Sequence, residues 1–249
     1  MEATFLDAVE RSLEMTAGSP RPIGRHRDAE PVTAADLVRF LAVACRVIGE
    51  RAPDLDRLDA ALGDGDHGEN MVSGFESVVR ALDEDMPTDT GEVLRRVGHT
   101  LVSSVGGASG PLYGTAFIEA GIALHGRDSL DLPALARGFE AAAAGLARRG
   151  RCVVGDKTIY DSLHPAALAV AEAAQRGATI GEALVAATRA ARRGMVDTIP
   201  LVARRGLALR LGERSRGHQD PGATSCFLMI RATLTVARER RRAGWRDGP

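Results

Sequence analysis

Apolar residues recur every three or four positions along most of the chain, which is the spacing of one face of an α-helix. The first such stripe runs from Leu37 to Ile48 and follows Thr33, a residue type that caps helix N-termini. Further stripes cover residues 71–82, 94–105, 112–124, 135–146, 165–174 and 221–240, and one more begins at Thr179. Thr179 is followed three residues later by Glu182, which is the spacing of a capping box. The pattern therefore predicts about eight helices.

The two-residue alternation that is typical of half-buried strands is nearly absent. Aromatic residues, which favour strands, make up 4% of the chain, and alanine dominates the positions between the stripes. Short connections between consecutive helices favour antiparallel neighbours. We therefore expect an all-α protein of about eight antiparallel helices.

Residues 17–31 are rich in proline, glycine and charge, which is typical of a linker. The residues ahead of them carry apolar positions at helical spacing and are compatible with a short helix. The sequence thus predicts an N-terminal extension over residues 1–31, a helical domain over residues 32–240 and a frayed C-terminal tail over residues 241–249.

The composition argues against several classes of protein. The net charge is −1, so the chain has no excess of basic residues for binding nucleic acid. No stretch approaches the roughly 18 apolar residues of a membrane-spanning helix, and the acidic N-terminus is not typical of a signal peptide. Three scattered cysteines make no zinc or disulfide framework. We therefore expect a cytoplasmic protein that binds neither nucleic acid nor membrane.

Four glycine-rich segments with polar side chains interrupt the helical pattern, and at least three directly precede a helix. They are residues 63–71 (GDGDHGENM), 106–115 (GGASGPLYGT), 155–161 (GDKTIYD) and 217–225 (GHQDPGATS). The unpaired N–H groups at a helix N-terminus can bind phosphate oxygens. One such loop is usually just a turn, but four of them in a small helical domain indicate a binding site.

Two of these segments carry further helix-start signals. Asp220 is the expected N-cap of the last helix, because Pro221 suits the first helical position. In the second segment, Ser109 or Gly110 is expected to cap a helix that Pro111 opens. Both patterns place backbone N–H groups beside polar loops.

The segment at residues 63–71 matches two known motifs in part and neither in full. Its glycine spacing is that of a dinucleotide-binding loop, but no buried strand precedes it and two carboxylates occupy it. An EF-hand counted from Asp64 would place Gly68 and Phe75 where oxygen ligands are required. Both readings are therefore excluded.

Asp59, Asp64 and Asp66 offer a set of ligands made of oxygen alone. Such a set suits Mg²⁺, which completes its coordination with water and substrate phosphates. His67 and the sole asparagine, Asn70, then begin the next helix beside these carboxylates. The sequence favours a hard-cation site, while the alternative of solvated turn and helix charges stays open. Two roles also stay open for the sole lysine, Lys157: it contacts a phosphate group, or it is an ordinary cation at the start of a helix.

The four segments together resemble a known family, the nucleotide-binding L subunit of dihydroxyacetone kinase. The resemblance runs from about residue 32 to residue 237 and rests on LGDGDHGENM, SSVGGASGPLYGT, GDKTIYDSLHP and LGERSRGHQDPGATS in that order. It implies a barrel of eight antiparallel helices that binds ADP or ATP at one end through two Mg²⁺ ions.

The resemblance also implies roles for particular residues. The implied metal ligands are Asp59, Asp64 and Asp66, the same three reached from the ligand chemistry. The implied nucleotide contacts are His67, Asn70, Met71, Ala108, Ser109, Thr115, Gly155, Asp220 and Gly222. The resemblance implies no residue of this chain that bonds covalently to substrate, so we predict no catalytic residue.

The partners that the resemblance implies are other proteins. Family members act with a separate K subunit, which holds dihydroxyacetone covalently through a histidine. The phosphoryl donor is ATP in one branch, and in the other a phosphocarrier protein of the sugar phosphotransferase system rephosphorylates bound ADP. The resemblance does not decide between these two phosphoryl donors. It also leaves open whether the chain forms a homodimer.

Three alternatives to a dihydroxyacetone kinase subunit also stay open. They are a nucleotide-loaded regulator of a transcription factor, a kinase subunit for a four-carbon ketose or polyol, and a degenerate domain that has lost its nucleotide.

One departure from the family bears on the nucleotide contacts. The family has RASYLG where this chain has LALRLG at residues 207–212, so Leu207 replaces a basic contact that Arg204, Arg205 or Arg210 would have to supply.

Overall fold

The structure, a computed structural model, describes residues 31–246, and in them it is almost entirely α-helical. Its α-helices are α2 (Ala34–Ala60), α3 (His67–Glu84), α4 (Thr90–Ser104), α5 (Ser109–Ala123), α6 (Leu132–Gly150), α7 (Tyr160–Gln175), α8 (Ile180–Asp197) and α9 (Pro221–Arg246). A 3₁₀ segment, η1 (Leu207–Ser215), precedes α9. The predicted all-α class and the predicted helix number are confirmed for this part of the chain. None of these helices is long and apolar enough to cross a bilayer.

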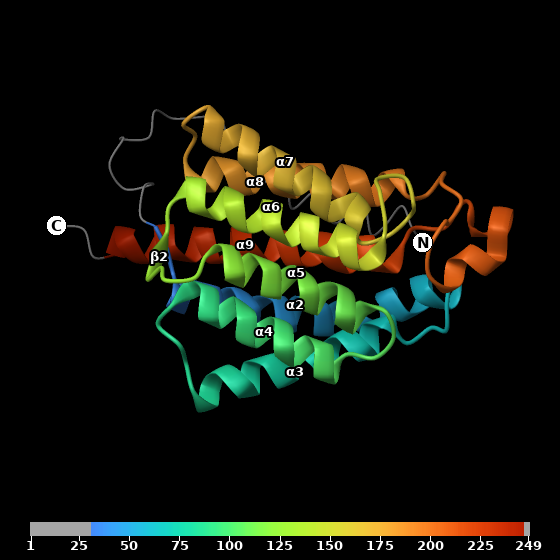
Figure 1. Cartoon of the computed structure of the whole chain (residues 1–249), viewed down its shortest axis with the longest axis horizontal. Helices are drawn as coiled ribbons and strands as arrows, with labels where there is room; N and C mark the ends of the chain where they lie inside the picture. The colour runs from blue at the N-terminus through green and yellow to red at the C-terminus, as the bar shows by residue number, and fades with distance from the viewer. Residues whose placement is uncertain (1–30, 247–249) are drawn as a thin grey trace.

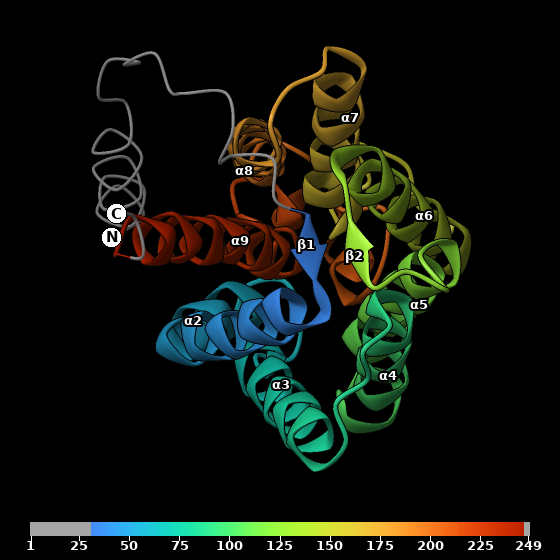
Figure 2. The same cartoon turned by 90° about the vertical axis from the view of Figure 1, so that its left-hand side faces the viewer.

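The helices form a closed up-and-down barrel. Each helix packs beside the next in sequence, and α9 closes the ring by packing against both α2 and α8. Figure 2 looks along the barrel and shows this ring of helices from one end. Because the helices alternate in direction, the loops gather at the two ends of the barrel (Figure 1).

The predicted helix starts at Thr33 and Thr179 are confirmed. The Thr33 hydroxyl accepts a hydrogen bond from the backbone N–H of Asp36, and the Asp36 carboxylate accepts one from the Thr33 N–H. The same reciprocal pair joins Thr179 and Glu182. Each box satisfies backbone donors that the first turn would otherwise leave unpaired.

Two helix ends and one pair of short strands differ from what the sequence pattern predicts. The stripe predicted to end at Ile48 continues as α2 through Pro53 to Ala60, with Leu55 buried in the core. The last helix, α9, continues to Arg246 and so into the predicted tail. A pair of two-residue strands, β1 (Val32–Thr33) and β2 (Ser129–Leu130), joins antiparallel, and neither is long enough to give an alternating pattern. The predicted extension over residues 1–30 and the tail at residues 247–249 lie outside the described residues.

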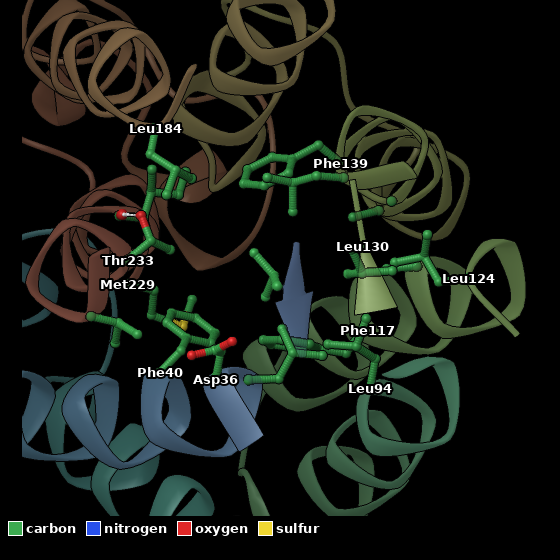
Figure 3. Close-up of a pocket in the computed structure, with 18 of the residues that line it drawn as sticks. Asp36, Phe40, Leu94, Phe117, Leu124, Leu130, Phe139, Leu184, Met229 and Thr233 are labelled. Carbon is green, nitrogen blue, oxygen red and sulfur yellow. Dashed lines mark hydrogen bonds between the residues drawn. The ribbon is translucent and has the colours of Figure 1, made fainter. Parts of the chain in front are cut away.

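The interior of the barrel holds an apolar cavity of about 200 Å³. Figure 3 shows aromatic and aliphatic side chains from several helices around it, among them Phe40, Phe117, Phe139 and Leu184. The polar side chains that border it include Asp36, which forms an ion pair with Arg240 at 3.2 Å. Transfer of phosphate charge into such apolar surroundings would be costly, so this cavity is not suited to a nucleotide.

Candidate functional site

A second cavity, of about 410 Å³, lies at the end of the barrel where all four glycine-rich segments meet. In Figure 1 this is the right-hand end, opposite β2 and the C-terminal end of α9. The residues that line it include Asp64 of the first segment, Ser109 of the second, Thr158 of the third and Asp220 of the fourth. The structure therefore brings together the four segments that the sequence singled out.

Three carboxylates meet at one wall of this cavity. Asp59 lies in the last turn of α2, and Asp64 and Asp66 lie in the loop between α2 and α3. One oxygen atom of each lies within 4.8 Å of the others. The loop is held in place by Asp59, whose Oδ2 accepts hydrogen bonds from the N–H groups of Gly65 at 2.9 Å and Asp66 at 3.1 Å. Gly65 has a φ of +84°, which glycine adopts without strain.

The electrostatics of this cluster fit a divalent cation. Burial raises the pKa of Asp59, and the negative charge of Asp64 raises it further against the two backbone hydrogen bonds. Crowded like charges of this kind are relieved when a cation lies among them. The donors are all carboxylate oxygens, which suits Mg²⁺ rather than a thiolate-seeking metal. The residues present therefore fit the magnesium site that the sequence predicted.

Three helix N-termini point at the same cavity. The first residues of α3, α5 and α9 (His67, Ser109 and Pro221) all line it. Among the described residues, no side chain caps the first turn of α5, so the N–H groups of Ser109 and Gly110 remain available for an anion. This corrects the predicted cap: Ser109 is the first helical residue, and Ala108 occupies the N-cap position.

The other two N-termini are capped by aspartates. The Asp220 carboxylate accepts a hydrogen bond from the N–H of Ala223 at 2.7 Å, which confirms its predicted capping role. The first turn of α3 is capped by Asp56, whose Oδ1 accepts from the N–H groups of Gly68 at 2.6 Å and Glu69 at 3.2 Å. The sequence did not reveal Asp56, because this cap comes from a different helix rather than from the residue before α3.

His67 connects three elements beneath the cavity. Its Nε2 lies 2.9 Å from the Ser225 hydroxyl of α9, and its Nδ1 lies 3.2 Å from the Ser109 hydroxyl of α5. The Tyr113 hydroxyl lies 2.7 Å from the same Ser225 hydroxyl. Burial lowers the pKa of His67 to about 4, although the charge of Asp56 opposes this shift. The imidazole is therefore neutral near pH 7, and its two hydrogen bonds connect the start of α3 to α5 and α9.

Two buried charged groups, Asp156 and Lys157, connect other loops that line the cavity. Asp156 accepts a hydrogen bond from Arg205 Nε at 3.0 Å, and Arg205 borders the cavity. Lys157 is 2% exposed, and its Nζ donates to the carbonyl of Thr198 at 2.7 Å and to that of His218. Lys157 is thus a buried connector of loops and not an ordinary surface cation before α7.

Asp220 is a further cavity residue whose pKa is strongly shifted. It is buried, and this burial raises the pKa of its carboxyl to about 7. The hydrogen bond from Ala223 and the charge of Lys157 oppose the shift, whereas the charge of Asp161 adds to it. A buried carboxyl with such a pKa is partly protonated near neutral pH.

Most of the predicted nucleotide contacts line the cavity. They are His67, Asn70, Ala108, Ser109, Asp220 and Gly222. Three others are not among the lining residues. Met71 is fully buried in the core, Thr115 donates its hydroxyl to the carbonyl of Pro111, and the Gly155 N–H donates to Asp161. Neighbouring residues of a helix point about 100° apart, so Asn70 faces the cavity while Met71 faces the core.

The structure adds lining residues that the motifs did not indicate. Of the three arginines proposed to replace a basic contact at Leu207, Arg205 lines the cavity, as does Leu207 itself. Arg149, at the end of α6, is a further basic group on this wall. The apolar part of the wall comes from Leu112, Leu146 and other side chains that the helical stripes placed simply as core. The lining therefore combines carboxylates with apolar and basic side chains.

These features define a class of protein: an all-α barrel whose loops form a cavity at one end. In this cavity a carboxylate cluster is suited to bind a cation, and helix N-termini are suited to bind an anion. Residues 61–235 match the family described as the DAK2 domain. The chain belongs to this family.

Known relatives agree with this assignment. The ADP-binding subunit DhaL of the PEP-dependent dihydroxyacetone kinase of Escherichia coli (strain K12) is 40% identical over 208 residues, which cover 84% of this chain and 99% of that subunit. The L-erythrulose 1-kinase of Mycolicibacterium smegmatis (strain ATCC 700084 / mc(2)155) is 33% identical over 201 residues, or 80% of this chain and 35% of that longer protein.

A solved structure shows the same fold. It is the crystal structure of the dihydroxyacetone kinase from C. freundii in complex with AMP-PNP and Mg²⁺, which matches with a TM-score of 0.63 at 22% sequence identity. The match covers 88% of this chain and 37% of that one. At this identity the likeness supports the barrel architecture alone.

Proposed function

We propose that this chain is the ADP- or ATP-binding subunit of a cytoplasmic kinase that phosphorylates a small ketose, dihydroxyacetone in the first place. The observation that carries the proposal is the cluster of Asp59, Asp64 and Asp66 at a cavity on which three helix N-termini converge. Carboxylates bind cations and repel phosphate, whereas helix N-termini bind phosphate and repel cations. Both kinds of group are satisfied when a metal ion and a polyphosphate occupy the site together. The relative from Escherichia coli is named as an ADP-binding subunit and aligns over nearly its full length.

In this proposal Asp59, Asp64 and Asp66 hold two Mg²⁺ ions. Bound Mg²⁺ would neutralise the charge of the nucleotide's phosphate groups. The first-turn N–H groups of α5, which no side chain caps, bind phosphate oxygens directly. The apolar wall with Leu112 and Leu146 suits the nucleotide base and keeps water away from it.

The substrate belongs to a partner in this proposal. A separate K subunit holds the ketose, and this chain positions the nucleotide whose terminal phosphoryl group moves to a substrate hydroxyl. Phosphoryl transfer needs positioning and charge neutralisation more than a covalent residue. The Escherichia coli relative is a subunit of a PEP-dependent kinase, which supports a phosphocarrier protein as the source of the phosphoryl group.

The test is to purify the chain without added nucleotide, denature it, and measure the released nucleotide and magnesium. We expect ADP near one molecule per chain, with about two Mg²⁺ ions. Activity toward dihydroxyacetone is expected with a K subunit and absent without it. An empty protein whose melting temperature does not rise with Mg²⁺ and ATP would instead indicate a degenerate domain.

A second candidate is a kinase subunit for a four-carbon ketose. It is favoured by the similarity to the L-erythrulose 1-kinase of Mycolicibacterium smegmatis. Because the substrate pocket lies in the partner, the two candidates share the same nucleotide cavity. Comparing dihydroxyacetone with L-erythrulose in the reconstituted assay decides between them.

A further inference from the structure

Two short segments beside the nucleotide cavity carry large apolar side chains in solvent. Among the described residues, eight large apolar side chains are exposed, and half of them lie in these two segments. Val153 and Val154 lie in the loop between α6 and α7, and Leu207 and Leu209 lie in η1. We call these four residues the rim. Solvent-exposed apolar side chains grouped in this way are typical of an interaction surface.

The two halves of the rim are joined through one buried carboxylate. Asp156 Oδ2 accepts hydrogen bonds from the N–H of Val153 at 3.1 Å and from Arg205 Nε at 3.0 Å. Its carbonyl accepts one from the N–H of Arg204 at 3.1 Å. Leu207 follows Arg205 by two residues. The loop and η1 are therefore fastened to each other at the mouth of the cavity.

The loop itself is rigidly supported from below. Asp161 is buried, and its two oxygens accept hydrogen bonds from the N–H groups of Gly155 at 2.6 Å and Thr158 at 2.7 Å. Val153 and Val154 are thus presented outward from a preorganised loop rather than exposed on a loose one. A surface ordered in advance loses less entropy on association.

The charges around the rim indicate what kind of surface would fit it. Arg204, Arg205 and Arg210 are exposed in or beside η1, and Arg151 is exposed at the start of the α6–α7 loop. The acidic residue of η1, Glu213, forms an ion pair with Arg216 at 3.0 Å. The rim is therefore apolar with a basic border. Its complement is a surface with an apolar centre and acidic side chains around it.

Position identifies the partner. Leu207 belongs both to the rim and to the lining of the nucleotide cavity. For phosphoryl transfer, the substrate hydroxyl must approach the terminal phosphorus to about 3–3.5 Å, so the protein that holds the substrate must cover the mouth of this cavity. Figure 1 shows η1, in orange, at the same end of the barrel as the loop between α2 and α3.

We propose that the rim is the docking surface for the substrate-holding K subunit, which presents an apolar face bordered by carboxylates. This proposal rests on the proposed function. The phosphocarrier protein and a second copy of this chain are the other occupants to be tested.

The experiment compares exposed apolar residues of the rim with exposed apolar residues outside it. Val153→Asp and Leu209→Asp change the rim at positions that do not line the nucleotide cavity. Ile122→Asp, near the far end of α5, and Leu168→Asp, on α7, are the controls. The exposures match: Val153 and Ile122 are each 59% exposed, Leu209 is 54% exposed and Leu168 is 50% exposed.

The readouts are the concentration of K subunit that gives half-maximal rate, the kcat at saturating K subunit, and the retention of nucleotide and magnesium. For the rim variants we expect the half-maximal concentration of K subunit to rise at least tenfold. Their kcat at saturating K subunit and their retention of nucleotide and magnesium should not change. For the controls we expect no change in any of them.

Each other outcome has a defined meaning. Rim variants that couple to the K subunit like wild type overturn the docking surface and leave the proposed function intact. A rise in the required phosphocarrier concentration alone, or a loss of self-association alone, assigns the rim to that occupant and also overturns the proposal. A wild-type chain that binds nucleotide but never couples to a K subunit overturns the proposed function and this proposal together.

Discussion

The interior cavity and the end cavity of the barrel have opposite chemistry. The interior cavity is formed by side chains of regular helices, such as Phe117 and Leu184, and is lined almost entirely by apolar groups. The end cavity is formed largely by loops and helix ends, and its lining includes the charged residues Asp64, Asp66 and Arg205. The helical stripes build the wall of the barrel, and the segments that interrupt the stripes build the site.

The two regions should therefore respond differently to mutation. A polar group exposed at the end cavity contributes little to folding, so its replacement should affect binding and activity. A buried apolar group at the interior cavity contributes mainly to folding, so its replacement should affect stability. The predictions below test this division.

The largest effect is expected for Asp64→Asn. This change removes one oxygen ligand of the carboxylate cluster, and we expect kinase activity with a K subunit to fall about 100- to 1,000-fold, or about 3–4 kcal/mol. The unfolding free energy of the nucleotide-free chain should stay the same or rise slightly, because Asp64 is exposed and repels Asp59. Urea denaturation and a steady-state assay measure the two quantities. Asp83→Asn, an exposed aspartate on α3, is the control. Near wild-type activity in Asp64→Asn would remove Asp64 from the metal site.

At the interior cavity, Leu184→Ala should show the reverse behaviour. Leu184 is buried and lines the cavity, so its truncation should lower the unfolding free energy by about 2–3 kcal/mol. Nucleotide retention in the folded protein should not change. Leu168→Ala, an exposed leucine on the neighbouring helix α7, should cost less than about 0.5 kcal/mol. Loss of bound nucleotide from folded Leu184→Ala would show that the two cavities are coupled.

A smaller effect is expected from the buried carboxyl of Asp220. Its pKa is raised to about 7 in the fold, against 3.8 for the free side chain, so the folded protein holds this proton more tightly than the unfolded chain does. The resulting stabilisation is complete below about pH 4 and is lost as the pH rises through about 7. Asp220→Asn removes this dependence and keeps an oxygen that can cap α9.

The comparison is made on nucleotide-free and magnesium-free protein. Between pH 5 and pH 7, the unfolding free energy of Asp220→Asn should rise relative to wild type by about 2 kcal/mol. Above pH 7.5 the difference should be constant. Parallel curves for the two proteins between pH 5 and pH 7 would show that Asp220 is ionised throughout this range.

The sequence predicted the two regions to different depths. Periodicity and capping boxes located the helices, because each of these signals lies within one segment of chain. The sequence also singled out the three carboxylates that the structure brings together, since Asp64 and Asp66 lie between two stripes, where no core position needs them. The nucleotide and its partner came from the resemblance to a family, not from the pattern.

What the sequence missed depends on contacts between segments. Asp56 caps a helix that begins 11 residues later in the chain. The sequence named Arg204, Arg205 and Arg210 as candidate basic contacts but not which of them lines the cavity, and Arg205 does so while bonded to Asp156 of another segment. The continuation of α2 through Pro53 was missed because proline usually ends a helix. Met71 lies beside a cavity residue in sequence but points into the core. The Asp56 cap, the Arg205–Asp156 contact and the passage through Pro53 leave no periodic signal in one segment, whereas the burial of Met71 agrees with its place in the stripe over residues 71–82.

The smallest effect tests whether the interior cavity is real empty space. Ala116 is buried and borders it, so Ala116→Leu should place three further carbons into the cavity and raise the unfolding free energy by about 1 kcal/mol. Ala143 is equally buried but is not among the lining residues, so Ala143→Leu should overpack the core and cost about 1–3 kcal/mol. Opposite signs for two equal additions of volume are expected only if one site has room and the other does not. If Ala116→Leu is as destabilising as Ala143→Leu, the interior is closed in solution, and the barrel then has one cavity, the one built by its loops.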